Sequence, residues 1–158
     1  MRPGNKDDTK SQTGYVFVIN RGAVDWKSKK ESTIAMSATE AEYIVASKAA
    51  MEAVWIRKFI LGLGVMPSIE SPIGMYCENS VAIIFANEPV VMKGTRHFLR
   101  KYHYVQKQVP KGEINLLKVH TDENLADPLT KALPREKLTR LANGIGLRLA
   151  NSFMHNCD

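Results

Sequence analysis

The sequence predicts an α/β fold in which helices cover the faces of a mixed β-sheet. Two strand-like segments joined by a turn come first, and strands then alternate with helices, an order typical of such sheets. The composition, 44% hydrophobic and 24% charged residues, is that of a globular protein. The 158 residues suit one domain, which we expect at 14–146, between a polar loop at 1–13 and a tail at 147–158.

The first expected elements form a β-hairpin. Residues 15–19 are a continuous apolar run rich in β-branched and aromatic side chains, which predicts a buried strand. Residues 20–22, Asn-Arg-Gly, have turn chemistry, and residues 23–28 alternate apolar with polar side chains. A further extended stretch at 32–36 leads into the next element.

A long helix is expected to begin at Ser37. Ser37 and Glu40 have the spacing of a capping box, and Gly62, Gly64 and Pro67 are typical of a helix end. Large apolar side chains recur along the segment at helical spacing, namely Ile44, Met51, Trp55 and Phe59.

The remainder of the chain alternates strands with helices. We expect a strand at 73–77, a helix at 80–86, a helix at 97–109 and a strand at 114–119. Asp127 and Pro128 then have the pattern of an N-cap followed by a first-turn proline, which predicts a final helical region.

Three acidic residues occupy positions where α/β folds build sites. Glu40 is in the first turn of the long helix, Glu78 lies between a strand and a helix, and Asp127 begins the last helical region. Together they would offer oxygen ligands for Mg²⁺ or Mn²⁺. The alternative is that each only stabilises a helix N-terminus. Glu42 also fits a capping box with Thr39, so spacing does not separate it from Glu40.

The net charge of +6 is unevenly distributed along the chain. Residues 1–30 carry +4, residues 31–92 carry −4 and residues 93–158 carry +6. This pattern suggests a polyanionic partner, or else a solvated surface. No apolar run is long enough to span a bilayer, no signal peptide is evident, and two cysteines suit a reducing compartment. We therefore expect an intracellular protein, cytoplasmic or nuclear, that is neither secreted nor bound to a membrane.

The segment 93–111 contains six basic residues and no acidic one. Basic side chains neutralise phosphates, and interleaved aromatic rings can stack on bases, so the segment is a candidate nucleic-acid contact. The alternative is an amphipathic helix that packs Phe98, Tyr102 and Val105 on the sheet. The candidate phosphate contacts are Lys93, Arg96, Arg100, Lys101 and Lys107.

Several ordered motifs give the chain a family resemblance. It resembles the ribonuclease H region of copia-type LTR retrotransposon (retrovirus-related) Pol polyproteins, as found in plants. The motifs that carry the resemblance lie at residues 6–17, 26–30, 37–43, 76–80, 96–103 and 118–131.

The resemblance implies a ribonuclease H-like fold and a hydrolase function. Such a domain is an endonuclease that cleaves the RNA strand of RNA/DNA hybrids during reverse transcription, using two Mg²⁺ or Mn²⁺ ions. By motif, Glu40, Glu78 and Asp127 match catalytic and metal-binding carboxylates, and Glu40 is favoured over Glu42. The implied partners are an RNA/DNA hybrid or other nucleic acid, and an upstream reverse transcriptase in the polyprotein.

Two departures from the family pattern bear on activity. Family members have a further strand with a catalytic aspartate before the loop that contains Asp7 and Asp8, and Glu78 stands where aspartate is usual. We therefore expect weak or absent nuclease activity from this chain, or a non-catalytic nucleic-acid-binding remnant. We also expect the strands at 15–19 and 73–77 to have unpaired edges, unless they pair directly.

Overall fold

The computed structural model describes residues 12–30, 38–66, 69, 71–88 and 96–148, with the backbone alone at 38–40 and 96–98. Contacts divide the chain into two compact units. Unit 1 comprises Met1–Thr33 and Asp122–Asp158, and unit 2 comprises Ile34–Thr121. The described part is a mixed α/β structure with four α-helices and two small sheets.

Unit 1 begins with the predicted hairpin. Strand β1 (Gln12–Ile19) pairs antiparallel with β2 (Gly22–Lys30). Asn20 and Arg21 form the two-residue turn with φ values of 50° and 63°, which matches the twist of the flanking strands. The strand begins at Gln12, earlier than the apolar run that predicts it. The hairpin is therefore confirmed, with a longer first strand.

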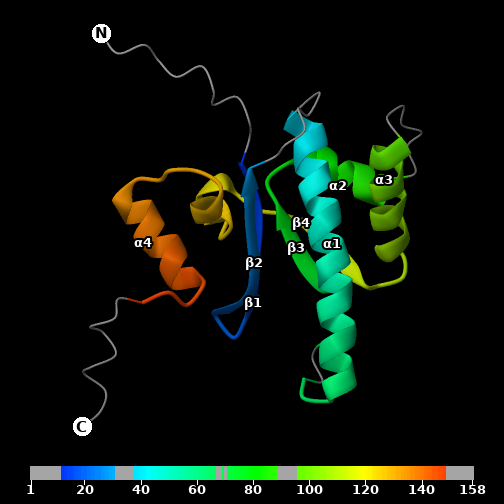
Figure 1. Ribbon diagram of the computed structural model, residues 1–158, viewed down its shortest axis with the longest axis horizontal. Coiled ribbons are helices and arrows are strands. Elements are labelled where there is room, and N and C mark those ends of the chain that lie inside the picture. The colour runs from blue at the N-terminus through cyan, green and yellow to red at the C-terminus, as the bar shows by residue number, and fades with distance from the viewer. Residues whose placement is uncertain (1–11, 31–37, 67–68, 70, 89–95, 149–158) are drawn as a thin grey trace. The chain divides into compact units, whose positions relative to one another are not determined.

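A helical layer packs against the hairpin in unit 1 (Figure 1). It consists of the 3₁₀ turn η3 (Asp127–Leu129) and helix α4 (Arg135–Gly144), and the short turn η2 (Thr121–Glu123) precedes them. The backbone amide of Ala23 donates to the Ile145 carbonyl oxygen at 2.9 Å, which ties β2 to the end of α4. Gly146 has φ +83°, and a Cβ there would lie 2.7 Å from the Arg21 carbonyl oxygen, so this approach requires glycine.

The predicted N-cap role of Asp127 is wrong. Asp127 is the first residue inside η3, the N-cap position belongs to Ala126, and no side chain caps the turn. The helical region is also split, because α4 starts only after Pro134. A proline disfavours helical backbone at the residue before it, which separates α4 from η3. The Asp127 carboxylate instead pairs with the ammonium groups of Lys131 and Lys137.

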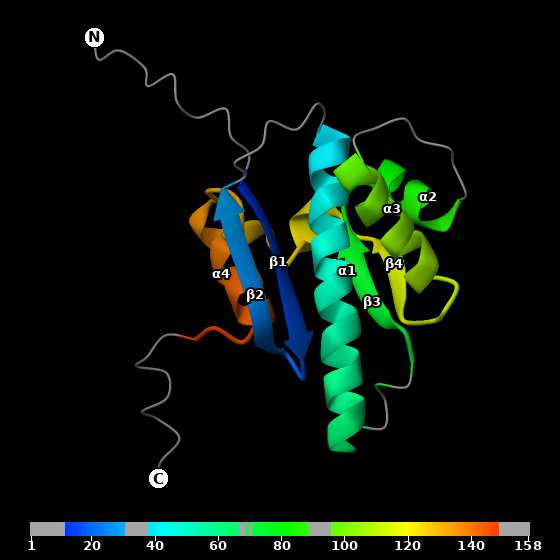
Figure 2. The same cartoon turned by 45° about the vertical axis from the view of Figure 1, so that its right-hand side comes forward.

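Unit 2 is a parallel strand pair packed with three helices (Figure 2). Its elements are α1 (Ala38–Leu63), β3 (Ile73–Cys77), α2 (Ser80–Asn87), α3 (Arg96–Gln108) and β4 (Ile114–Lys118). Each was predicted to within a few residues. The expected extension at 32–36 and the Ser37 cap lie outside the described residues.

The buried face of α1 differs from the stripe that its large apolar residues suggest. Met51, Trp55 and Phe59 are 43%, 59% and 53% exposed, and the Trp55 and Phe59 rings stack on each other at 5.2 Å. The buried side chains are mostly smaller ones, namely Tyr43, Ser47, Ala49, Ala50, Ala53, Val54 and Ile56. Small residues let α1 approach α3 and the strands closely.

The described strands form two separate sheets, which confirms the expected unpaired edges. β1 pairs only with β2 and β3 only with β4, so the direct β1–β3 pairing is not formed among the described residues. The Ile73 amide donates to Glu113, and the Cys77 carbonyl accepts from Val119. Because bonding alternates along a parallel strand, the backbone groups of Gly74 and Tyr76 point to the other edge of β3.

None of the described helices is both long and apolar enough to cross a membrane.

Candidate functional site

Glu78 lies directly after β3, at the carboxyl ends of the parallel strands of unit 2. Its side chain is half-buried, and its Oε2 accepts a hydrogen bond from the Thr121 hydroxyl at 3.2 Å. The Lys118 ammonium donates to the Glu78 carbonyl oxygen. Lys118 ends β4 and Thr121 follows it, so the two strand ends together hold Glu78. A carboxylate at this edge has the position that α/β folds use for binding sites.

Helix capping does not account for Glu78. The N-cap of α2 is Asn79, whose side-chain oxygen accepts from the amides of Val81 at 2.9 Å and Ala82 at 3.2 Å. Asn79 thus satisfies the amides that the capping alternative assigned to acidic side chains. The Glu78 carboxylate therefore remains a candidate ligand, and its Oε2 accepts from the neutral hydroxyl of Thr121.

Asp127 in unit 1 is a buried carboxylate held by two lysines. Its side chain is 3% exposed; Oδ1 lies 3.0 Å from Lys131 Nζ, and Oδ2 lies 3.2 Å from Lys137 Nζ. Lys137 Nζ also lies 3.4 Å from Asp122 Oδ1. A buried charge requires such pairing because removal from water is costly. The two lysines thus neutralise the buried carboxylate of Asp127.

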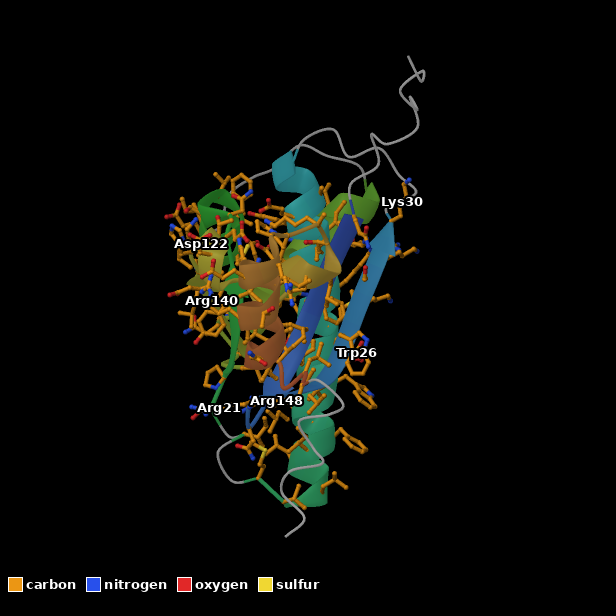
Figure 3. All side chains as sticks on the ribbon, turned by 90° about the vertical axis from the view of Figure 1, so that its left-hand side faces the viewer. Arg21, Trp26, Lys30, Asp122, Arg140 and Arg148 are labelled. Atoms are coloured by element: carbon orange, nitrogen blue, oxygen red, sulfur yellow. The ribbon has the colours of Figure 1, made fainter. Side chains whose placement is uncertain are left out.

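The position of Lys137 is fixed by both of its acidic neighbours. Burial favours the neutral amine, but the hydrogen bonds and charges of Asp127 and Asp122 outweigh it and raise the pKa of Lys137. Arg140 donates from its guanidinium to the Asp122 carbonyl oxygen at 2.8 Å, which holds α4 to the segment before η3. Figure 3 shows Asp122 and Arg140 on this side of unit 1.

The backbone of Glu40 lies in the first turn of α1, and its side chain is outside the described residues. Glu42 is exposed, and its charge reaches the end of β3. Burial raises the pKa of the Cys77 thiol; a hydrogen bond with the backbone of Asn79 opposes this, and the negative charge of Glu42 adds to it. The structure therefore leaves Glu42 beside Glu40 as a candidate.

Helix α3 is amphipathic, as expected from the sequence, but its apolar face packs mainly on α1 and α2 and not on the sheet. The side chain of Phe98 lies outside the described residues. Tyr102 and Val105 are 1% and 0% exposed, while Arg100 and Lys107 are exposed and Lys101 is half-buried. The packing and the phosphate-contact predictions use different faces, so they are compatible. Lys93 and the side chain of Arg96 lie outside the described residues.

The candidate carboxylates suit a hard divalent ion by ligand type, since Mg²⁺ and Mn²⁺ take oxygen ligands. Both oxygens of Asp127 face lysine ammonium groups, so a metal ion could bind there only by displacing at least one of them. Within the described side chains, no three His, Cys, Asp or Glu residues are grouped closely enough to hold a metal. Glu78 and Asp127 belong to different units, and each is described within its own.

Sequence reasoning missed the residues that hold the carboxylates. The spacing of Lys131, four residues after Asp127, is a usable signal for an ion pair. Lys137 is ten residues away, and Thr121 is far from Glu78 along the chain, so no local pattern identifies these contacts.

Comparisons with known proteins place the chain among transposon proteins. It is 35% identical over 144 residues to the retrovirus-related Pol polyprotein from transposon TNT 1-94 of Nicotiana tabacum, covering 91% of this chain and 11% of that protein. It is 33% identical over 144 residues to that from transposon RE1 and 32% identical over 144 to that from RE2, both of Arabidopsis thaliana. In each case 91% of this chain and 10% of the relative are covered.

The homologues of the chain are thus retrovirus-related Pol polyproteins from plant transposons. The chain spans about a tenth of the length of these relatives. No family model matches it, and no solved structure does.

Proposed function

We propose that this homologue of plant transposon Pol polyproteins is their ribonuclease H segment, which cleaves the RNA strand of RNA/DNA hybrids. The observation that carries the proposal is the homology over 91% of the chain, together with carboxylates at the motif positions. The proposed catalytic, metal-binding residues are Glu40, Glu78 and Asp127. Arg100, Lys101 and Lys107 of α3, with Lys93 and Arg96, are the proposed phosphate contacts.

Two Mg²⁺ or Mn²⁺ ions, when bound, would activate a water and stabilise the leaving oxygen. The chain's own residues supply the supporting geometry. Thr121 and Lys118 orient Glu78 through its carboxylate and its carbonyl oxygen, respectively. Such a fixed carboxylate reduces the rearrangement needed before reaction. Asp127 is paired with Lys131 and Lys137, so a bound ion would take the place of at least one of these ammonium groups.

A second function, nucleic-acid binding without cleavage, is favoured by one observation. Both oxygens of Asp127 are already paired with lysine ammonium groups, so an ion must displace at least one of them. In this case α3 would bind phosphates with an affinity that depends on salt and does not require a divalent ion.

The test is cleavage of a labelled RNA/DNA hybrid in Mg²⁺ and in Mn²⁺. We would assay this chain and the chain extended by the segment that precedes it in the tobacco relative. In the active protein, Glu40→Gln, Glu78→Gln and Asp127→Asn are each expected to lower the rate by about 10²-fold or more. Glu42→Gln decides between the two helix glutamates, and Glu136→Gln, exposed on α4, is the charge-matched control.

Cleavage lost in the three variants and kept in the control supports the nuclease proposal. Hybrid binding without cleavage by either protein supports the non-catalytic alternative. If neither protein binds nor cleaves the hybrid, both proposals are wrong.

A further inference from the structure

We propose that the second half of β2, from Trp26 to Lys30, is a nucleic-acid contact surface that binds a phosphate backbone. We name it the β2 surface. It is distinct from the basic face of α3 and rests on the proposed function only in taking the RNA/DNA hybrid as its ligand. Figure 3 shows Trp26 and Lys30 along β2, on the side of the strand away from β1.

The exposed charge of this strand is positive. All five residues of the β2 surface are exposed, and three of them are lysines: Lys27, Lys29 and Lys30. Asp25 is the acidic residue of β2, and its Oδ2 is buried. This oxygen of the carboxylate is therefore not part of the surface that a ligand meets. A row of exposed ammonium groups is complementary to a polyanion.

Trp26 is the second feature that points to a nucleic acid. Its side chain is 60% exposed, although tryptophan gains more from burial than most side chains. Exposed aromatic rings beside cations are typical of surfaces that bind single strands or strand ends, where stacking contributes about 1–3 kcal/mol per base. A solvated lysine run alone would not require this ring.

The edge position of β2 lets the surface act as a unit. Among the described strands only β1 pairs with β2, so none of these strands bonds to the other edge of β2. Successive side chains alternate between the two faces of a strand. Lys27 and Lys29 thus project from one face and Trp26 and Lys30 from the other, and a ligand lying along the edge can contact both sets.

The β2 surface is also fixed to the segment that carries Asp127. Ser28 Oγ, in the middle of the surface, donates to the Leu129 carbonyl oxygen at 2.6 Å, and Gln12 Nε2 donates to the same oxygen at 3.2 Å. A Cβ at Gly14, which pairs with Ser28, would lie 3.1 Å from Thr130 Cγ2. A nucleic acid bound along β2 would therefore be held beside η3, within the same unit.

The chain offers a direct optical test, because Trp26 and Trp55 are its two tryptophans. In a Trp55→Phe background, which keeps an aromatic ring stacked on Phe59, fluorescence reports Trp26 alone. A fluorescein-labelled 12-base-pair RNA/DNA hybrid is titrated in EDTA, and binding is followed both by anisotropy and by Trp26 emission. We expect Trp26 emission to change with the same midpoint as the anisotropy.

Charge variants test the lysines. Lys27→Gln/Lys29→Gln is expected to weaken binding about tenfold at low salt and to reduce the slope of log affinity against log salt by about 2. The control, Lys58→Gln/Arg135→Gln, makes the same change in charge at exposed positions elsewhere and should leave the slope within experimental error of the parent. Circular dichroism confirms that the variants are folded.

The outcomes separate this inference from the proposed function. In one outcome the hybrid binds while Trp26 emission is unchanged and Lys27→Gln/Lys29→Gln matches its control. In that case the proposal for the β2 surface is wrong and the proposed α3 contacts stand. If Arg100→Gln/Lys107→Gln binds the hybrid as tightly as the parent while Lys27→Gln/Lys29→Gln loses affinity, the proposal for the β2 surface stands and the proposed α3 contacts are wrong. If the unaltered chain does not bind the hybrid, both are wrong.

Discussion

At the scale of single residues, Asp127 is the clearest case of a side chain whose role depends on distant partners. Its carboxylate is buried, and each oxygen faces an ammonium group, from Lys131 on one side and Lys137 on the other. Lys131 is 44% exposed and Lys137 is 18% exposed, so the two ion pairs differ in how much water screens them. The Lys137 pair is therefore the stronger contributor to stability.

Asp127→Asn should destabilise unit 1 by about 1–3 kcal/mol, because a buried site would keep its cations and lose their counter-charge. Lys131→Gln should cost less, about 0–1 kcal/mol, because that lysine is half exposed. Urea unfolding followed by circular dichroism measures both. Equal losses of stability in the two variants would show that the burial of Asp127 does not determine how much its ion pairs contribute to stability.

The same residue shows what local sequence patterns leave out. The aspartate-proline pair predicts an N-cap, since Asp is common at that position and Pro at the next. The carboxylate instead binds Lys137, which the fold brings near from α4. Asn79 is the opposite case, because a cap that bonds two and three residues ahead is a local feature.

At the scale of elements, the hairpin and the alternation of helices and strands follow from local signals. The Asn20-Arg21 turn and the alternating pattern of β2 predict their structures without reference to the rest of the chain. The buried face of α1 could not be predicted in this way. Periodicity identifies the large side chains Trp55 and Phe59, but packing selects the small ones, such as Ala50 and Ala53.

The contact between α1 and α3 gives a prediction that depends on pH. Tyr43 is fully buried and donates from its hydroxyl to the Tyr102 carbonyl oxygen at 3.2 Å. Burial, and then the nearby phenol of Tyr102, raise the pKa of Tyr43 above that of an unfolded tyrosine, near 10. Above about pH 10 the unfolded chain loses this proton while the folded chain keeps it, so stability falls as the pH rises.

Tyr43→Phe removes both the hydrogen bond and this titration. At pH 8 the variant should be less stable by about 0.5–1.5 kcal/mol, the usual contribution of one hydrogen bond. The deficit should shrink between pH 10 and 11, because only the parent protein loses stability through Tyr43. Urea midpoints at pH 8, 9, 10 and 11 test this, with Tyr76→Phe, 67% exposed, as the control. A constant deficit across this range contradicts the buried phenol.

At the scale of the whole molecule, the open edges of β1 and β3 are the main feature that the sequence analysis anticipated and the structure supports. Each strand is paired on one side, and no described strand joins the two sheets. Unpaired strand edges favour pairing with another strand. The chain matches only 10–11% of the length of its relatives, and in those proteins further segments are present that could supply such a strand.

The edge of β3 yields the last prediction. In the chain alone, the amides of Gly74 and Tyr76 should exchange with solvent faster than those of Ile73 and Cys77, which face β4. Adding the preceding segment of the tobacco relative should slow Gly74 and Tyr76 selectively, because a strand paired at this edge would accept from both amides. Hydrogen exchange followed by NMR measures each amide separately.

The matched control is an extension of equal length with a scrambled sequence, which should leave the alternation in exchange rates unchanged. Protection of Gly74 and Tyr76 in the chain alone would show that the edge is already covered. Uniform slowing of all four amides by the extension would instead indicate general stabilisation of unit 2. Only selective protection of the outward-facing pair supports strand addition, because a paired strand bonds every second residue of its neighbour.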